Sequence, residues 1–132
     1  MKVFSFALPD ARLKPIALDA VRRSKTYNDI MYADDVSVAV NGPAFRSAQS
    51  FDEAVQSLIA KAEDLGAEAR FKAEDELLYV WRTPALGFPN GAYAYISEDE
   101  NGVKVSFYGR ALYGQIDFGV NNTFIQKWAS AL

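Results

Sequence analysis

The sequence predicts an α+β domain in which a long helix and a C-terminal helix pack on an antiparallel sheet of about four to five strands. Three observations predict it. A capped amphipathic stretch with helical spacing precedes a run of short alternating segments. Turn residues separate those segments, as they do in hairpins. A second helical stretch closes the chain, so the helices flank the strands and are expected to cover one face of the sheet.

The first helix is predicted over Phe51–Leu65. Ser50 and Glu53 have the spacing of a capping box, in which each side chain accepts a hydrogen bond from the other residue's backbone amide. Gly66 is placed to end the helix, because glycine adopts the left-handed backbone conformation at little cost. The predicted buried face consists of apolar residues at helical spacing, namely Ala54, Leu58, Ala62 and Leu65.

The strands are predicted from alternation of polar and apolar residues. Asp34–Val40 alternates and ends at the turn signal Asn41-Gly42-Pro43, which predicts a strand ahead of the long helix. Asn101-Gly102, between two alternating segments, is the strongest hairpin signal in the chain. The strands predicted after the helix are Glu68–Lys72, Glu76–Thr83, Ala92–Ser97 and Val103–Tyr108.

The closing helix is predicted over roughly Asn122–Ala131, with Asn121 or Asn122 as its N-cap. Phe124, Ile125, Trp128 and Leu132 fall on its apolar face. One shared core is expected beneath both helices. Its predicted members are Leu58, Leu78 or Val80, Ile96, Val105 or Phe107, and Trp128.

The length of the chain favours a single domain over residues 1–132, with residues 1–33 as a loosely structured N-terminal segment. The basic residues Arg22, Arg23 and Lys25 are expected in solvent, the alternative being a phosphate or lipid-headgroup contact. The N-terminal apolar run Val3–Leu8 is too short to cross a bilayer. As written the chain is expected to be cytoplasmic, or to belong to the cell envelope if an anchor precedes it.

Composition excludes several kinds of chemistry. The chain has no histidine and no cysteine, which excludes Ser-His-Asp triads, zinc fingers, thiol catalysis and disulfides. A net charge of −3 argues against a nucleic-acid partner. No cofactor is expected, and any metal would need oxygen ligands. The pair Asp34-Asp35 is read as a polar strand start in preference to a metal site, because no third ligand is close in sequence.

The segment Tyr108–Asn121 contains most of the residues that could take part in binding or catalysis. In the structural interpretation, which we favour, Arg110 pairs with Asp117, Asp117 accepts backbone amides, and Asn121 caps the helix. Asp117→Asn and Arg110→Ala would then lower thermal stability. In the functional interpretation the same corner binds an anion, with Arg110 as the guanidinium clamp, Tyr113 beside the ligand and Arg82 as a second charge.

The same residues resemble the signature of the DUF1499 family, small bacterial and plastid domains without an assigned activity. Arg110 is followed by Asp117-Phe118-Gly119-Val120-Asn121, which is similar to the family's D-x-G-V-N core. Upstream, Arg82-Thr83 and Gly87-Phe88-Pro89-Asn90 resemble a further pair of family segments, so the resemblance covers roughly Phe51–Leu132. The chain departs from the family at Gly109 and Ala111, where a serine is usual. Many relatives resemble lipoproteins or carry one membrane helix, which implies an association with the cell envelope.

Two functions follow as hypotheses. The first is a non-catalytic binding or interaction domain, taking a small anionic or lipid-like ligand or a protein partner near the Arg110/Asp117 corner. The second is a carboxylate-dependent hydrolase that uses Asp117 and a second acid from Asp34, Asp35 or Glu76, which requires both carboxylates in one cleft. The candidate ligand-binding residues are Arg110, Tyr113, Asp117, Asn121 and Arg82.

Overall fold

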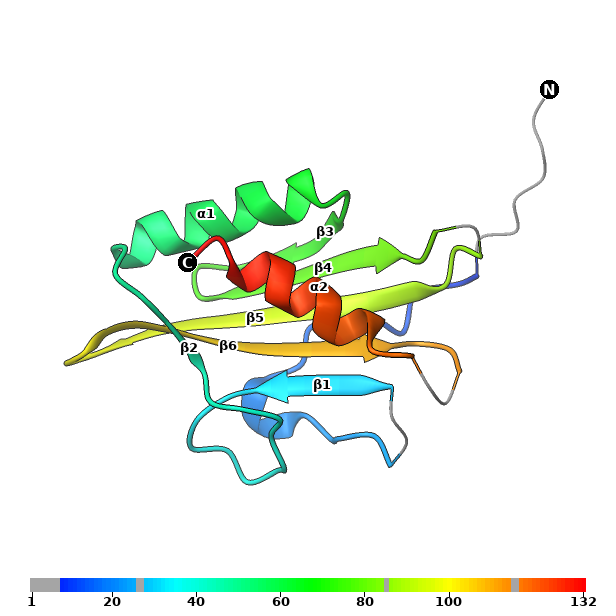
Figure 1. The fold of residues 1–132 in the computed structure, drawn as a ribbon, viewed down its shortest axis with the longest axis horizontal. Helices are drawn as coiled ribbons and strands as arrows, with labels where there is room; N and C mark the ends of the chain where they lie inside the picture. The colour runs from blue at the N-terminus through cyan, green and yellow to red at the C-terminus, as the bar shows by residue number, and fades with distance from the viewer. Residues whose placement is uncertain (1–7, 26–27, 85, 115–116) are drawn as a thin grey trace.

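The computed structural model describes residues 8–25, 28–84, 86–114 and 117–132. It is built on a six-stranded, predominantly antiparallel sheet with two α-helices packed against one face (Figure 1). The α+β class is therefore confirmed, with slightly more strands than expected. The elements in chain order are η1 (Leu18–Ala20), β1 (Asp29–Tyr32), β2 (Phe45–Ser47), α1 (Phe51–Asp64), β3 (Glu68–Lys72), β4 (Glu76–Arg82), β5 (Pro89–Asp99), β6 (Gly102–Ala111) and α2 (Val120–Ala129).

The sheet order is β1-β6-β5-β4-β3, and β2 also pairs with β6. The long hairpin β5–β6 forms its centre and pairs from Asn90↔Ala111 to Asp99↔Gly102. Its turn lies at Glu100 and Asn101, one residue earlier than the predicted Asn101-Gly102. The Asp99 carboxylate accepts the Asn101 amide at 2.9 Å, and Gly102 takes a φ of 106° beside the turn. The hairpin was thus predictable, while its turn lies one residue earlier than predicted.

The predicted strand Asp34–Val40 is wrong, and β1 lies just before it. The chain turns back after β1, because the Asn41 amide donates to the Met31 carbonyl and the Ala33 amide to the Gly42 carbonyl. Asp35 adopts a φ of 52°, which a strand does not permit. Val36 and Val38 are still half-buried. Their alternation therefore reflects packing of an irregular loop rather than a strand ladder.

The two helices are close to their predicted bounds. The Ser50–Glu53 capping box is present at the start of α1, and Gly66 follows its end with a φ of 81°. Beneath the helices lies a core of side chains from α1, α2 and the strands. Trp128 is fully buried there, and its indole Nε1–H donates to the Leu58 carbonyl at 2.8 Å. As predicted, this core contains Leu58, Ile96, Val105, Phe107 and Trp128.

The prediction for β4 was wrong by one residue. Leu77 and Tyr79 face the helices, whereas Leu78 and Val80 point to the opposite face of the sheet. Side chains alternate along a strand, so a continuous apolar run such as this one is compatible with either orientation. The opposite face is buried as well, which is why both sets of side chains are apolar.

The N-terminal segment, residues 8–25 of the described chain, covers that second face. It contributes η1 and buries Leu13 and Val21 against the sheet, and in Figure 1 it is the blue trace behind the strands. Tyrosine hydroxyls from the sheet hold its main chain: Tyr93 donates to the Lys14 carbonyl and Tyr95 to the Ile16 carbonyl. Apart from Leu8, the apolar run Val3–Leu8 lies outside the described residues.

A buried ion pair fastens the end of this segment. The Arg23 guanidinium lies 3.1 Å from the Asp29 carboxylate, whose side chain is only 2% exposed. The same carboxylate also accepts the Tyr108 hydroxyl at 3.0 Å. Arg22 and Lys25 are exposed as expected, but Arg23 is not the solvated residue that the sequence indicated.

Candidate functional site

The corner between β6 and α2 is organised by Asp117. Its Oδ1 accepts the Gly119 amide at 2.8 Å, and its carbonyl accepts the Val120 amide. The intervening Phe118 and Gly119 both have positive φ, 54° and 79°. Such a conformation is unusual for phenylalanine. Asp117 therefore satisfies a backbone donor ahead of the helix, as the structural interpretation expected.

Asn121 does not cap α2, contrary to prediction. The N-cap is Gly119, which has no side chain to offer, and Asn121 lies one residue inside the helix. The Asn121 side chain is buried, and its Nδ2 donates to Asn90 Oδ1 at 3.1 Å and to Asp117 Oδ2 at 3.0 Å. Asn90 Nδ2 in turn donates to the Phe88 carbonyl. A chain of polar side chains thus links the corner to β5.

Asn90 is a site residue that the sequence did not indicate. It precedes the predicted strand Ala92–Ser97 and is not among the predicted site residues. In the structure it belongs to β5 and is almost fully buried. The family-like segment Gly87-Phe88-Pro89-Asn90 is the signal at this position, but it does not show that the asparagine is buried, since its partner Asn121 follows far along the chain.

Arg110 is not brought to Asp117. No ion pair joins the two residues, although the structure describes both. Arg110 shares its face of β6 with Tyr108, which packs on the face opposite the helices. Burial raises the pKa of Tyr93 on that face, and the positive charge of Arg110 opposes the rise. The predicted Arg110–Asp117 pair is therefore wrong, because strand alternation separates the two side chains.

Arg82 and Tyr113 have partners in the N-terminal segment. Arg82 donates to Asp10 Oδ2 at 3.0 Å and to the Gly87 carbonyl at 2.8 Å. Hydrogen bonding from Arg70, with the charges of both arginines, holds the pKa of Asp10 below its ordinary value. The Tyr113 hydroxyl donates to the Pro9 carbonyl at 2.7 Å. Both candidate residues thus hold this segment in place.

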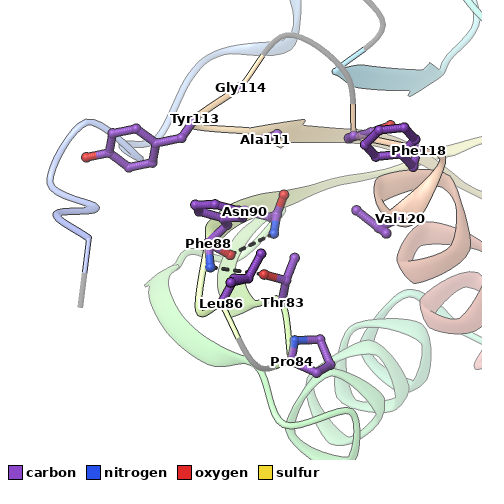
Figure 2. Close-up of a pocket in the computed structure, with 11 residues that line it drawn as sticks. Thr83, Pro84, Leu86, Phe88, Asn90, Ala111, Tyr113, Gly114, Phe118 and Val120 are labelled. Carbon is purple, nitrogen blue, oxygen red and sulfur yellow. Dashed lines mark hydrogen bonds between the residues drawn. The ribbon is translucent and has the colours of Figure 1, made fainter. Parts of the chain in front are cut away.

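A pocket of about 300 Å³ opens beside the corner, between the β4–β5 loop and the start of α2 (Figure 2). Asp117 is the charged residue among the described residues that line it. Phe118 is 90% exposed and Leu86 71% exposed, and both lie at this pocket. Its described lining is Thr83, Pro84, Leu86, Phe88, Asn90, Ala111, Tyr113, Gly114, Asp117, Phe118 and Val120.

A family model described as "Protein of unknown function (DUF1499)" matches residues 8–132. The chain belongs to the DUF1499 family. The match extends well beyond the motif region Phe51–Leu132 and includes the N-terminal segment, in agreement with the burial of Leu13 against the sheet. A search of curated proteins finds no match.

The DUF1499 domain has a second hollow next to the pocket, of about 320 Å³. Pro84 and Val120 line both, so the two hollows adjoin. The floor of the second includes Trp81, which stacks on Phe124 with ring centroids 5.0 Å apart. Lys127 lies at this hollow and not among the described residues of the first.

The acidic residues proposed for hydrolysis do not meet in the DUF1499 domain. Glu76 starts β4, whereas the pocket lies beyond that strand's other end, and burial raises the pKa of Glu76. Asp34 accepts the Ala44 amide at 3.1 Å and does not line the pocket. Within the described ranges no three acidic side chains cluster as they would around a metal ion. Neither described α-helix has the length and apolar character needed for a bilayer crossing.

Proposed function

We propose that this DUF1499 domain is a non-catalytic binding domain whose pocket takes the apolar part of a lipid-like ligand. The observation that carries the proposal is the pocket of about 300 Å³ with exposed Leu86, Phe88 and Phe118 around it. Binding sites for small molecules are concave and mostly apolar, with a few placed polar groups. Asn90 and Asp117 are such groups here.

The exposure of these side chains supports the proposal. Of the four large hydrophobic residues exposed in the described chain, three line this pocket, and the fourth is Val40. Covering a large apolar side chain contributes roughly 1.5–3 kcal/mol. Phe118 also holds an unfavourable backbone conformation while remaining in solvent. Phe118 gains no stabilisation from burial within the fold. We expect a ligand that covers its ring to supply that stabilisation.

The charges favour an apolar ligand over a small anion. Arg110 lies on the other face of the sheet, and Arg82 is paired with Asp10. Asp117, which lines the pocket, is itself negative. A protein partner would have to place an apolar side chain in the same pocket, and it remains the second form of this proposal.

Hydrolysis finds less support. A two-carboxylate mechanism needs a second acid facing the same cleft. Among the described residues of the pocket lining Asp117 has no such partner, and its carboxylate already accepts two hydrogen bonds.

The envelope association implied by the resemblance belongs to the same proposal. A domain that works near a membrane meets single acyl chains and amphiphiles, which suit an apolar pocket of this size. We therefore propose that the ligand is of the kind found at membranes.

Binding of N-phenyl-1-naphthylamine, a neutral fluorescent probe, tests the function. We expect the domain to enhance the fluorescence of the probe in a saturable way. In Leu86→Ser and in Phe118→Ser the affinity for the probe should fall about three- to tenfold, where a factor of ten corresponds to about 1.4 kcal/mol of binding free energy. Val40→Ser is the matched control, because Val40 is also exposed, at 42%, but does not line the pocket. Absence of saturable binding, or an equal loss in the control, would overturn the proposal.

A further inference from the structure

The polar side chains of the pocket are few, and they differ in what they can offer a ligand. Figure 2 shows Thr83, which directly follows β4, and Asn90, which belongs to β5, below the end of β6. Thr83 Oγ1 accepts the Phe88 amide at 3.0 Å, and Asn90 is held by Phe88 and Asn121. Asp117 contributes the negative charge. The Thr83 hydroxyl and the Asn90 amide are neutral, so Asp117 makes the charge of the pocket negative.

Asp117 retains capacity to accept further hydrogen bonds. A carboxylate has about four acceptor positions. Its two oxygens accept one hydrogen bond each in the described structure, from the Gly119 amide and from Asn121 Nδ2. The residue is half-buried, so a ligand group reaching it would be partly removed from water. The Asp117 carboxylate can therefore accept a further hydrogen bond from a ligand, and a positively charged donor would form the strongest one.

The start of α2 does not reverse this sign. A helix N-terminus corresponds to about +0.5 elementary charge, which favours anions. Asp117 already lies there and accepts the Gly119 amide. Its full negative charge exceeds that partial charge. Two basic residues, Lys127 and Arg82, line the adjoining hollow and are not among the described residues of this pocket, and Arg82 is paired with Asp10.

We infer that the pocket selects an amphiphile with one apolar chain and a protonated amine at its polar end, with Asp117 as the counter-charge. This inference rests on the proposed function and names the ligand class for the same pocket. The apolar chain contacts Leu86, Phe88 and Phe118, and the ammonium donates to Asp117. A carboxylate or phosphate in that position meets a like charge and is rejected.

Three ligands of equal chain length test the charge preference: octylamine, octanol and octanoate, each displacing the neutral probe N-phenyl-1-naphthylamine at pH 7. We expect octylamine to displace it at a concentration at least tenfold below that of octanoate, with octanol between them. Raising the salt concentration narrows the gap, because screening weakens the ion pair. This ranking uses the wild-type domain and does not depend on the folding of any variant.

Asp117→Asn tests the named residue. It keeps an acceptor for the Gly119 amide, and its melting curve establishes that it is folded. We expect the amine and carboxylate to become equal within about twofold, while octanol binding is retained. Glu100→Gln, at the exposed tip of the β5–β6 turn, removes the same charge elsewhere and is expected to preserve the ranking. An unchanged preference in Asp117→Asn overturns the assignment of Asp117.

The two proposals fail in different ways. If the probe does not bind, the pocket is not a ligand site and both are wrong. If the probe binds but octanoate displaces it as well as octylamine does, the binding function stands and the preference for a cation is overturned.

Discussion

The two faces of the sheet are buried by different means. On one face, regular helices cover the strands, and the core there is formed almost entirely by apolar contacts around Trp128. On the other, an irregular segment crosses the sheet, and tyrosine or arginine side chains donate to its carbonyls. Tyr93, Tyr95 and Arg70 bind the carbonyls of Lys14, Ile16 and Leu13.

The reason for the difference is the backbone. A helix satisfies most of its own amides and carbonyls, so it can pack through an apolar face alone. A segment without regular structure has no such ladder, and its buried carbonyls need donors from elsewhere. Tyrosine suits this position because its ring fills the core and its hydroxyl reaches the carbonyl. The first face therefore depends on packing and the second on side-chain donors, and substitutions can separate the two.

The largest effect is expected on the helix-covered face, from Trp128→Ala. Its ring is fully buried and packs against Tyr79, Phe107 and Phe124. Deleting a buried large aromatic costs about 3–5 kcal/mol in the free energy of unfolding. Urea denaturation measures it, with Trp128→Phe as a milder control that removes only part of the ring and its indole donor. A loss below about 1 kcal/mol for the alanine variant would show that this face does not depend on packing.

A slightly smaller loss is expected from Asp29→Ala on the other face. It leaves Arg23 inside the fold without its counter-charge and removes the acceptor of the Tyr108 hydroxyl. Breaking a buried pair by removing one partner costs roughly 3–5 kcal/mol, and the partial exposure of Arg23 places this one near about 3 kcal/mol.

The matched control is the surface pair between Arg46 and Asp99, 2.7 Å apart and well exposed. Arg46→Ala breaks this pair and is expected to change the urea midpoint little, since exposed pairs contribute little. Similar losses in Asp29→Ala and Arg46→Ala, measured by the same urea titration, would contradict the role given to the buried pair.

Removing single tyrosine hydroxyls is expected to loosen the second face selectively. Tyr93→Phe and Tyr95→Phe keep the rings and lose the donors to Lys14 and Ile16. Each should cost about 1 kcal/mol, the net value of a typical hydrogen bond. Native-state hydrogen exchange should rise in residues 8–25 more than in α1. Uniform acceleration across both regions would mean that the two faces do not open separately.

The smallest expected effect is the loss of stability at low pH that comes from protonation of Asp10. Asp10 joins the N-terminal segment to Arg70 and Arg82, and its folded pKa is lowered, first by the hydrogen bond from Arg70. The pKa of Asp10 is lower in the folded state than in the unfolded state. Its contribution to the free energy of unfolding is therefore present above about pH 4 and is lost as the pH falls through the folded pKa.

The side chains of Asp10 and Arg70 are about a third exposed, so Asp10 is expected to contribute at most about 1 kcal/mol to the free energy of unfolding. Thermal unfolding between pH 7 and pH 2 measures it. Asp10→Asn should be less stable than wild type at neutral pH and approach it in acid. A constant difference across this range would exclude a contribution from ionised Asp10.

The fold was more predictable than the candidate site. Capping of α1 by Ser50 and Glu53, the hairpin near Gly102 and the strand Glu68–Lys72 depend on residues close together in the chain, and all three are present. The sequence-predicted site residues are not in the expected arrangement. Arg110 points to the other face, and Asn121 pairs with the unpredicted Asn90. Asp117 accepts a backbone amide as expected, but its second donor is Asn121 in place of Arg110.

The sequence by itself determined the two helices and the strands that follow α1, and it excluded histidine and cysteine chemistry, because both follow from composition and local spacing. Only the tertiary structure decided which face each β4 side chain occupies, how the N-terminal segment is held, and that Leu86 and Phe118 meet at one pocket. The physical reason is that these outcomes depend on partners distant in the chain. Alternation tells that a strand has two faces, but only the packed neighbours determine which of them turns toward the helices.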